Sequence, residues 1–104
     1  MRHTINVLVN SQRVFYALAS VPRRQILAFL SQTALSTADL ADRFRLTRPA
    51  ISRHLSVLQR AGLIAGERQG QRVLYRLKRD ALLEALARFA SEVDGPLRTP
   101  RNAI

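Results

Sequence analysis

The segment from Leu46 to Leu63, LTRPAISRHLSVLQRAGL, most constrains the fold of this 104-residue chain. Its apolar residues Ile51, Leu55 and Leu58 are spaced four and three apart, so they line one face of a helix. Gly62 suits the left-handed position at which such a helix ends. The spacing therefore predicts an amphipathic helix whose apolar side packs on a core.

The opposite face of this helix is basic. At about 100° per residue it collects Pro49, Ser52, Arg53, Ser56 and Arg60, with two arginines, two hydroxyl groups and no acid. A solvated helix usually mixes charges of both signs, whereas a helix that lies against phosphates and base edges does not. This face predicts a contact with nucleic acid.

Helical patterns also precede this segment. A first helix is expected over residues 11–20 and a second over about 22–32, because a proline at position 22 disfavours helical geometry in the residue before it. Ser36 and Asp39 form a capping-box pattern that begins a third helix, and Thr47 can cap the fourth.

The pattern changes after Gly62. Residues 64–68 and 72–77 have the composition of two short strands around Gln69-Gly70-Gln71, and Asp80 is expected to cap a last helix. These elements predict a mainly α fold with a small β-hairpin, in the order α-α-α-α-β-β-α. This is the order of a winged helix-turn-helix, in which the reading helix enters the major groove with its N-terminus first.

Composition limits the class of protein. The chain carries 17 Lys and Arg against 7 Asp and Glu, a formal net charge of +10, and Lys78 is its only lysine. Arginine suits phosphate oxygens and guanine edges better than lysine does. A chain of this length is expected to form one domain over residues 11–94, with an N-terminal arm over 1–10 and a flexible tail over 95–104.

Several classes of function are excluded by what the sequence lacks. It has no cysteine, which excludes disulfides, thiol sensing and thiolate metal sites. It has no apolar run long enough to span a bilayer and no secretory leader pattern, so a cytoplasmic protein is expected. No motif for a catalytic centre or phosphate-cradling loop is present, so an enzyme is not expected.

The run TRPAISRHLSVLQRAGLI, with the basic hairpin after it, resembles the ArsR/SmtB family of bacterial repressors. The resemblance covers roughly residues 13–90. It implies a homodimer joined by the first and last helices, which binds double-stranded DNA at an inverted-repeat operator and blocks transcription.

Two departures from the family's metal sensors point to its metal-independent, SdpR-like branch. Metal-sensing members carry cysteines on the third helix, where this chain has Ser36, Thr37 and Ala38. Others carry Asp and His on the last helix, where this chain offers Asp80 and Glu84 as carboxylate ligands and no histidine. The resemblance therefore implies no metal, no cofactor and an autoregulatory repressor.

A third departure is Arg45, in the turn where the family often has glycine or asparagine. A left-handed conformation would strain an arginine at this position, which also adds a cation close to the expected DNA surface.

The candidate site residues form two groups. Arg53 and Ser52 are expected to read base edges, while Arg23 and Arg24 join the other arginines near phosphates. The candidate DNA contacts are Thr47, Arg48, Pro49, Ser52, Arg53, His54, Ser56, Arg60, Arg68, Gln71 and Arg72. The candidate dimer-interface residues are Val14, Phe15, Leu18, Leu82, Leu83, Leu86 and Phe89.

Two other functions remain open on the sequence. One is a winged-helix regulator that responds to a small ligand. The other is a protein–protein interaction module whose basic face meets an acidic partner. The inducing signal, a membrane protein or a small ligand, is not specified by the sequence.

Overall fold

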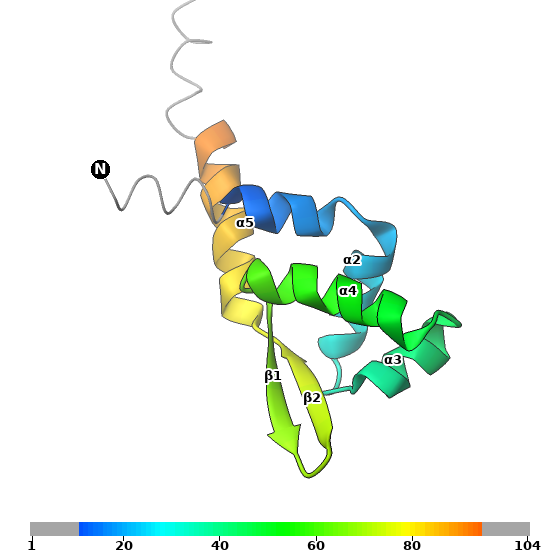
Figure 1. Cartoon of the computed structure of the whole chain (residues 1–104). Coiled ribbons are helices and arrows are strands. Elements are labelled where there is room, and N and C mark those ends of the chain that lie inside the picture. The colour runs from blue at the N-terminus through cyan, green and yellow to red at the C-terminus, as the bar shows by residue number, and fades with distance from the viewer. Residues whose placement is uncertain (1–10, 95–104) are drawn as a thin grey trace, which may run out of the picture.

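The computed structural model describes residues 11–94, so the predicted arm (1–10) and tail (95–104) lie outside the described residues. Figure 1 shows helices followed by a hairpin and a last helix, which confirms the predicted mainly α, winged helix-turn-helix order. The elements are a first helix described over residues 11–18, α2 (Val21–Leu30), α3 (Thr37–Phe44), α4 (Arg48–Arg60), β1 (Ile64–Gln69), β2 (Arg72–Leu77) and α5 (Arg79–Asp94).

Side-chain caps fix where the central helices begin. The Ser36 hydroxyl accepts a hydrogen bond from the Asp39 backbone N–H at 3.1 Å, and the Asp39 carboxylate accepts one from the Ser36 N–H at 3.0 Å. The Thr47 hydroxyl accepts from the Ala50 N–H at 3.2 Å. Both predicted caps are confirmed, and each satisfies a donor that the first turn of a helix leaves unpaired.

One predicted boundary is confirmed and another is wrong. The break between the first two helices falls at Ser20, as expected, and the Ser20 hydroxyl caps α2, which begins at Val21. At the other end of the chain, α5 begins at Arg79, so Asp80 lies inside the first turn and does not cap it. A carboxylate there still stabilises the helix, because it lies near the positive end of the helix dipole.

One core joins all the elements. The largest fully buried side chains come from α2, α3, α4 and the entry to β1, and burying each such aliphatic side chain contributes about 1.5–3 kcal/mol. Val14 and Ala17 of the first helix and Ala85 of α5 complete the core. The seven largest are Ile26, Leu40, Ile51, Leu55, Leu58, Leu63 and Ile64.

The hairpin turns through two residues. Gln69 pairs directly with Arg72, so the loop is Gly70-Gln71 and not the three residues expected from the sequence. Gly70 has a φ of +65°, which suits the first central position of a tight hairpin turn. The N–H and C=O of Leu35 pair with those of Tyr75 at 3.2 and 2.9 Å, which joins the hairpin to the segment before α3.

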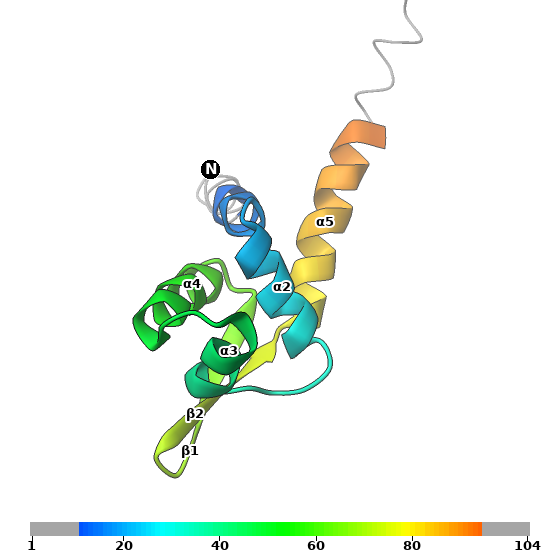
Figure 2. The same cartoon turned by 90° about the vertical axis from the view of Figure 1, so that its right-hand side faces the viewer.

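The elements extend in two directions from the core. Figures 1 and 2 both show the hairpin projecting from one end of the described structure and α5 from the other. The first helix lies beside α4, with α3 next to the N-terminal end of α4 (Figure 1). No helix within residues 11–94 combines the length and apolar character needed to cross a membrane.

Candidate nucleic-acid interface

The polar face of α4 points to solvent. Arg48, Pro49, Ser52, Arg53 and Arg60 are all exposed, while the apolar face of the same helix is buried in the core. The helix contains no acidic residue. This arrangement matches the periodicity of the sequence and leaves an uncompensated positive surface, which attracts a polyanion.

The other candidate residues of α4 are less accessible. Thr47 is exposed, but its hydroxyl is used as the N-cap of the helix. Ser56 and His54 are partly buried. The structure therefore divides the candidates on this helix into an exposed set and residues that also pack against the protein.

Arg72 connects the hairpin to the start of α3. Its Nη2 donates to Oδ2 of Asp39 at 2.8 Å and to the hydroxyl of Ser36 at 3.2 Å. The same Asp39 oxygen accepts the backbone N–H of Ser36, so three groups meet at the capping box. The backbone hydrogen bond from Ser36 lowers the pKa of Asp39 most, then the side-chain hydrogen bond from Ser36; burial raises it, and Arg72 and Arg43 lower it further.

Arg68 lies on the other face of the hairpin. It pairs across the strands with Val73, and paired residues share a face, whereas Arg72 pairs with Gln69 on the opposite face. No acidic group within residues 11–94 lies within ion-pair distance of Arg68. Farther from the tip, Arg76 and Glu67 approach to 3.8 Å, and because both are more than half exposed this pair contributes little to stability.

A groove runs between the hairpin and the starts of α3 and α4. It has a volume of about 400 Å³ and is lined by Arg48 of α4, Gln71 of the turn and Arg72 of β2. Thr37 and Ala38 of α3 also line it. Arg48 of α4 and two adjacent residues of the hairpin, Gln71 and Arg72, therefore lie around one groove although the two elements are distant in sequence.

Arg23, which the sequence placed near phosphates, binds the backbone of the preceding helix. Its Nε donates to the carbonyl of Ala17 at 2.8 Å and its Nη2 to that of Tyr16 at 2.9 Å, at the end of the first helix. The guanidinium lies 5.1 Å from the centre of the Tyr16 ring. Arg24 likewise donates to the carbonyl of Leu18, at 2.5 Å. Both arginines bind backbone of the preceding helix, which the sequence pattern did not reveal.

Arg23 also reaches α4. Its Nη1 lies 3.4 Å from Nδ1 of His54. A guanidinium can only donate, so this contact requires Nδ1 to accept and the imidazole proton to lie on Nε2. Burial lowers the pKa of His54 most, followed by the positive charges of Arg23 and Arg53. One arginine thus joins the first helix, α2 and α4.

The candidate dimer residues separate into core and surface. Val14 is buried in the chain's own core, and Leu18 and Leu82 pack against it. Phe15, Leu83, Leu86 and Phe89 are exposed, by 36%, 55%, 40% and 49% respectively. The Phe15 and Phe89 rings make an edge-to-face contact with centroids 5.2 Å apart, which joins the first helix to α5 and leaves both rings partly uncovered.

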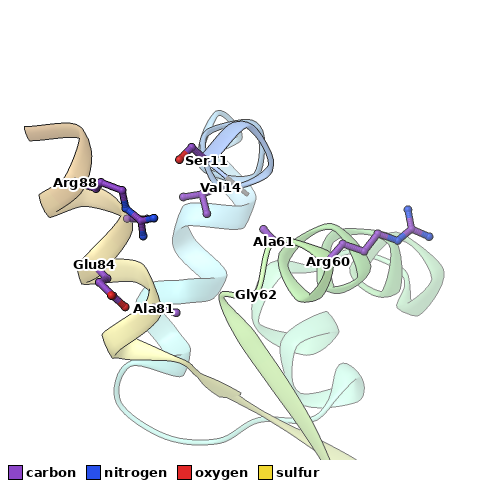
Figure 3. A pocket seen from close by; sticks show the side chains of 9 residues that line it. Ser11, Val14, Arg60, Ala61, Gly62, Ala81, Glu84 and Arg88 are labelled. Carbon is purple, nitrogen blue, oxygen red and sulfur yellow. The ribbon is translucent and has the colours of Figure 1, made fainter. Parts of the chain in front are cut away.

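A cavity of about 230 Å³ lies between the first helix, the end of α4 and α5. Figure 3 shows Glu84 and Arg88 projecting from α5 beside it, while the Arg60 side chain extends away.

Within residues 11–94, no group of three or more His, Cys, Asp or Glu side chains is placed to hold a metal ion.

The chain is similar to known regulators. Residues 20–65 match the family described as "Bacterial regulatory protein, arsR family". The transcriptional repressor SdpR of Bacillus subtilis is 34% identical over 73 residues, which cover 70% of this chain and 81% of that protein. The transcriptional activator HlyU of Vibrio cholerae is 37% identical over 76 residues, covering 70% of each.

A solved structure extends the similarity to the fold. It is the homodimeric winged helix-turn-helix DNA-binding domain of a possible ArsR-family transcriptional regulator from Mycobacterium bovis. The TM-score is 0.74 and the identity 26%, over 95% of this chain and 92% of that one. The chain therefore belongs to the arsR family of bacterial regulatory proteins, a family of regulators and not of enzymes.

Proposed function

We propose that this chain is a homodimeric transcriptional repressor that binds double-stranded DNA at an inverted-repeat operator. The observation that carries the proposal is the exposed, acid-free face of α4, which continues into the groove lined by Arg48, Gln71 and Arg72. A helix of this kind fits the major groove, and the hairpin beside it fits the neighbouring backbone.

The roles of the side chains follow from their placement. Ser52 and Arg53 project from the middle of the exposed face and read base edges, since Arg suits the O6 and N7 acceptors of guanine. Arg48 and Arg60 meet phosphates at the two ends of α4, and Arg68 meets one at the hairpin. Arg72 acts through Asp39, because it holds the hairpin beside α3.

The homodimer forms through the first helix and α5. The exposed side chains Phe15, Leu86 and Phe89 give these helices an apolar surface that water solvates poorly. A two-fold axis there repeats α4 in the second subunit, so the two halves of the operator lie one helical turn, about 34–36 Å, or a multiple apart.

The absence of cysteine favours a repressor that senses neither thiol oxidation nor a thiolate-bound metal. The relatives include both a repressor and an activator, and a reporter assay distinguishes the two directions of regulation. Autoregulation is the simplest arrangement for such a repressor, and its inducer is a small ligand or a protein partner.

Footprinting the purified full-length protein on the DNA upstream of its own gene tests the proposal. A protected inverted repeat is expected, with affinity that falls steeply as salt rises, because each neutralised phosphate releases counterions. A reporter fused to the same DNA should lose expression when the protein is present. A log–log salt slope near zero contradicts DNA binding, and a reporter that gains expression contradicts repression.

A further inference from the structure

Arg45 occupies a backbone conformation that is unfavourable for its residue type. It ends α3 with φ of 55° and ψ of 36°, and its N–H donates to the carbonyl of Ala41. Within residues 11–94 it is the only residue other than glycine with a positive φ. The left-handed conformation brings the Cβ of an L-residue close to the following carbonyl oxygen, so glycine would fit this position with less strain.

The Arg45 side chain makes no interaction with the described residues that offsets this strain. It is exposed, and no hydrogen bond, ion pair or ring contact within residues 11–94 involves its guanidinium. Some arginines have hydrogen-bond partners in the described part of the chain: Arg23, Arg24 and Arg79 donate to backbone carbonyls, and Arg72 binds a carboxylate. Arg45 differs from the other exposed arginines there that lack such a partner in its left-handed backbone. A strained residue without a local contact is a candidate for a function outside the chain.

The place of Arg45 says what it can bind. Arg45 stands two residues before Thr47, the cap of α4, and three residues before Arg48. It therefore lies next to the N-terminus of the helix that enters the major groove of DNA in the proposed function. Arg45 lies in the turn, outside the helix face that carries Ser52 and Arg53. With α4 in the DNA major groove, its side chain would therefore lie beside that groove and not over base edges. The positive end of the α4 dipole adds to its attraction for an anion.

We infer that Arg45 binds a phosphate of the DNA backbone at the edge of the major groove that α4 enters. The strained backbone of the turn is retained because it carries the arginine that makes this contact. The inference rests on the proposed function. It makes Arg45 a source of affinity without sequence preference, since phosphates are the same at every base pair.

Four variants of the full-length protein test it. Arg45→Gly and Arg45→Asn relieve the strain and remove the charge, whereas Arg45→Lys keeps both. Arg43→Gln is the matched control: it removes a charge two residues away, where the guanidinium lies 5.6 Å from the centre of the Phe29 ring. Each variant is compared with the parent by thermal unfolding and by salt titration of binding to operator and unrelated DNA.

The expected result separates stability from binding. Arg45→Gly and Arg45→Asn melt at a higher temperature than the parent, bind both DNAs more weakly by the same factor, and reduce the magnitude of the salt slope by about 1.8 per dimer, for two lost phosphates. Arg45→Lys retains the parent's slope, and so does Arg43→Gln.

Three outcomes overturn the inference. If Arg45→Gly and Arg45→Asn keep the parent's affinity and slope, no phosphate is bound there. If they lose affinity only for the operator, the residue reads bases. If they melt at the parent's temperature or below, the turn is not strained. Failure of the parent itself to bind any DNA is a different result, which contradicts the proposed function as well.

Discussion

Arg72 of the hairpin and Asp39 of α3 stand 33 positions apart in the chain, yet Nη2 of the arginine lies 2.8 Å from Oδ2 of the aspartate. That carboxylate also accepts the Ser36 N–H and so begins α3. Oδ2 of Asp39 therefore accepts one hydrogen bond that begins α3 and another that comes from the hairpin. This second contact, made by the first residue of β2 next to the turn, orients the hairpin relative to α4 through α3.

A double-mutant cycle on Asp39→Ala and Arg72→Ala should show coupling of about 0.2–1 kcal/mol, because both side chains are partly exposed. Asp39→Ala alone should cost more, about 0.5–2 kcal/mol, because it also removes half of the capping box. Urea unfolding measures both. The pair Glu67 and Arg76, 3.8 Å apart, is the control, and coupling there as large as at Asp39 and Arg72 contradicts the assignment.

The low pKa of Asp39 makes stability depend on pH in acid. Its pKa lies below the ordinary value of 3.8, chiefly because of the hydrogen bonds from Ser36, so its contribution is complete above that value. It is lost as pH falls through the lower native pKa, because the unfolded chain binds the proton first. Asp39→Asn should flatten the free energy of unfolding below about pH 4. An unchanged acid limb in this variant would show that other carboxylates dominate.

His54 should make stability depend on pH nearer neutrality. Its pKa is lowered below 6.5, first by burial and then by the charges of Arg23 and Arg53. Just below pH 6.5 the imidazole is therefore protonated more in the unfolded chain than in the native protein. Its contribution is complete above 6.5 and falls as pH drops from there through the native pKa. Arg23→Gln should raise the pKa of His54 in an NMR titration, because one of the charges that lower it is removed.

Arg24→Gln is the matched control for that titration. It makes the same change of charge at the next residue, but the Arg24 side chain binds the carbonyl of Leu18 and not His54. An equal shift in both variants would mean that net charge, and not the contact at Nδ1, sets the pKa of His54.

Local signals explain which parts of the fold could be predicted. The caps at Ser36 and Thr47 depend on residues at most three positions away, and the apolar face of α4 depends on its own periodicity. The charged side chains that connect elements could not be predicted in this way. Arg23 binds Tyr16 and Ala17 and lies beside His54, and these contacts require three elements already packed.

The apolar residues of the first helix illustrate the same limit. Val14 and Phe15 are adjacent and both apolar, and a sequence pattern assigns both to an interface. The structure buries Val14 at 4% exposure and leaves Phe15 at 36%, because only one of them points toward Ala17 and the core. Which of two adjacent apolar residues is buried depends on the helices of the same chain that pack against them. The spacing of apolar residues along the sequence does not specify those helices.

Arg53 and Arg68 should affect DNA binding differently. Arg53→Ala should relax sequence preference at one base pair of each half-site and cost about 1–3 kcal/mol for the operator. Arg68→Ala should weaken operator and unrelated DNA by the same factor, because a phosphate contact carries no sequence information. Competition binding on a set of singly altered operators measures both. The assigned roles are wrong if Arg68→Ala changes base preference or if both variants bind every site like the parent.

Phe89→Glu should dissociate the homodimer without unfolding the protomer. Phe89 is 49% exposed in the single chain, so the substitution removes little of the core, but it places a charge on the apolar surface that it shares with Phe15 and Leu86. Sedimentation velocity should show a monomer, and affinity for the full operator should fall toward that for one half-site. Ser91→Glu is the control, because Ser91 is exposed and 200° of helical rotation separates it from Phe89 on α5 (Arg79–Asp94). A dimer that survives Phe89→Glu, or an equal loss in Ser91→Glu, would place the two-fold interface elsewhere.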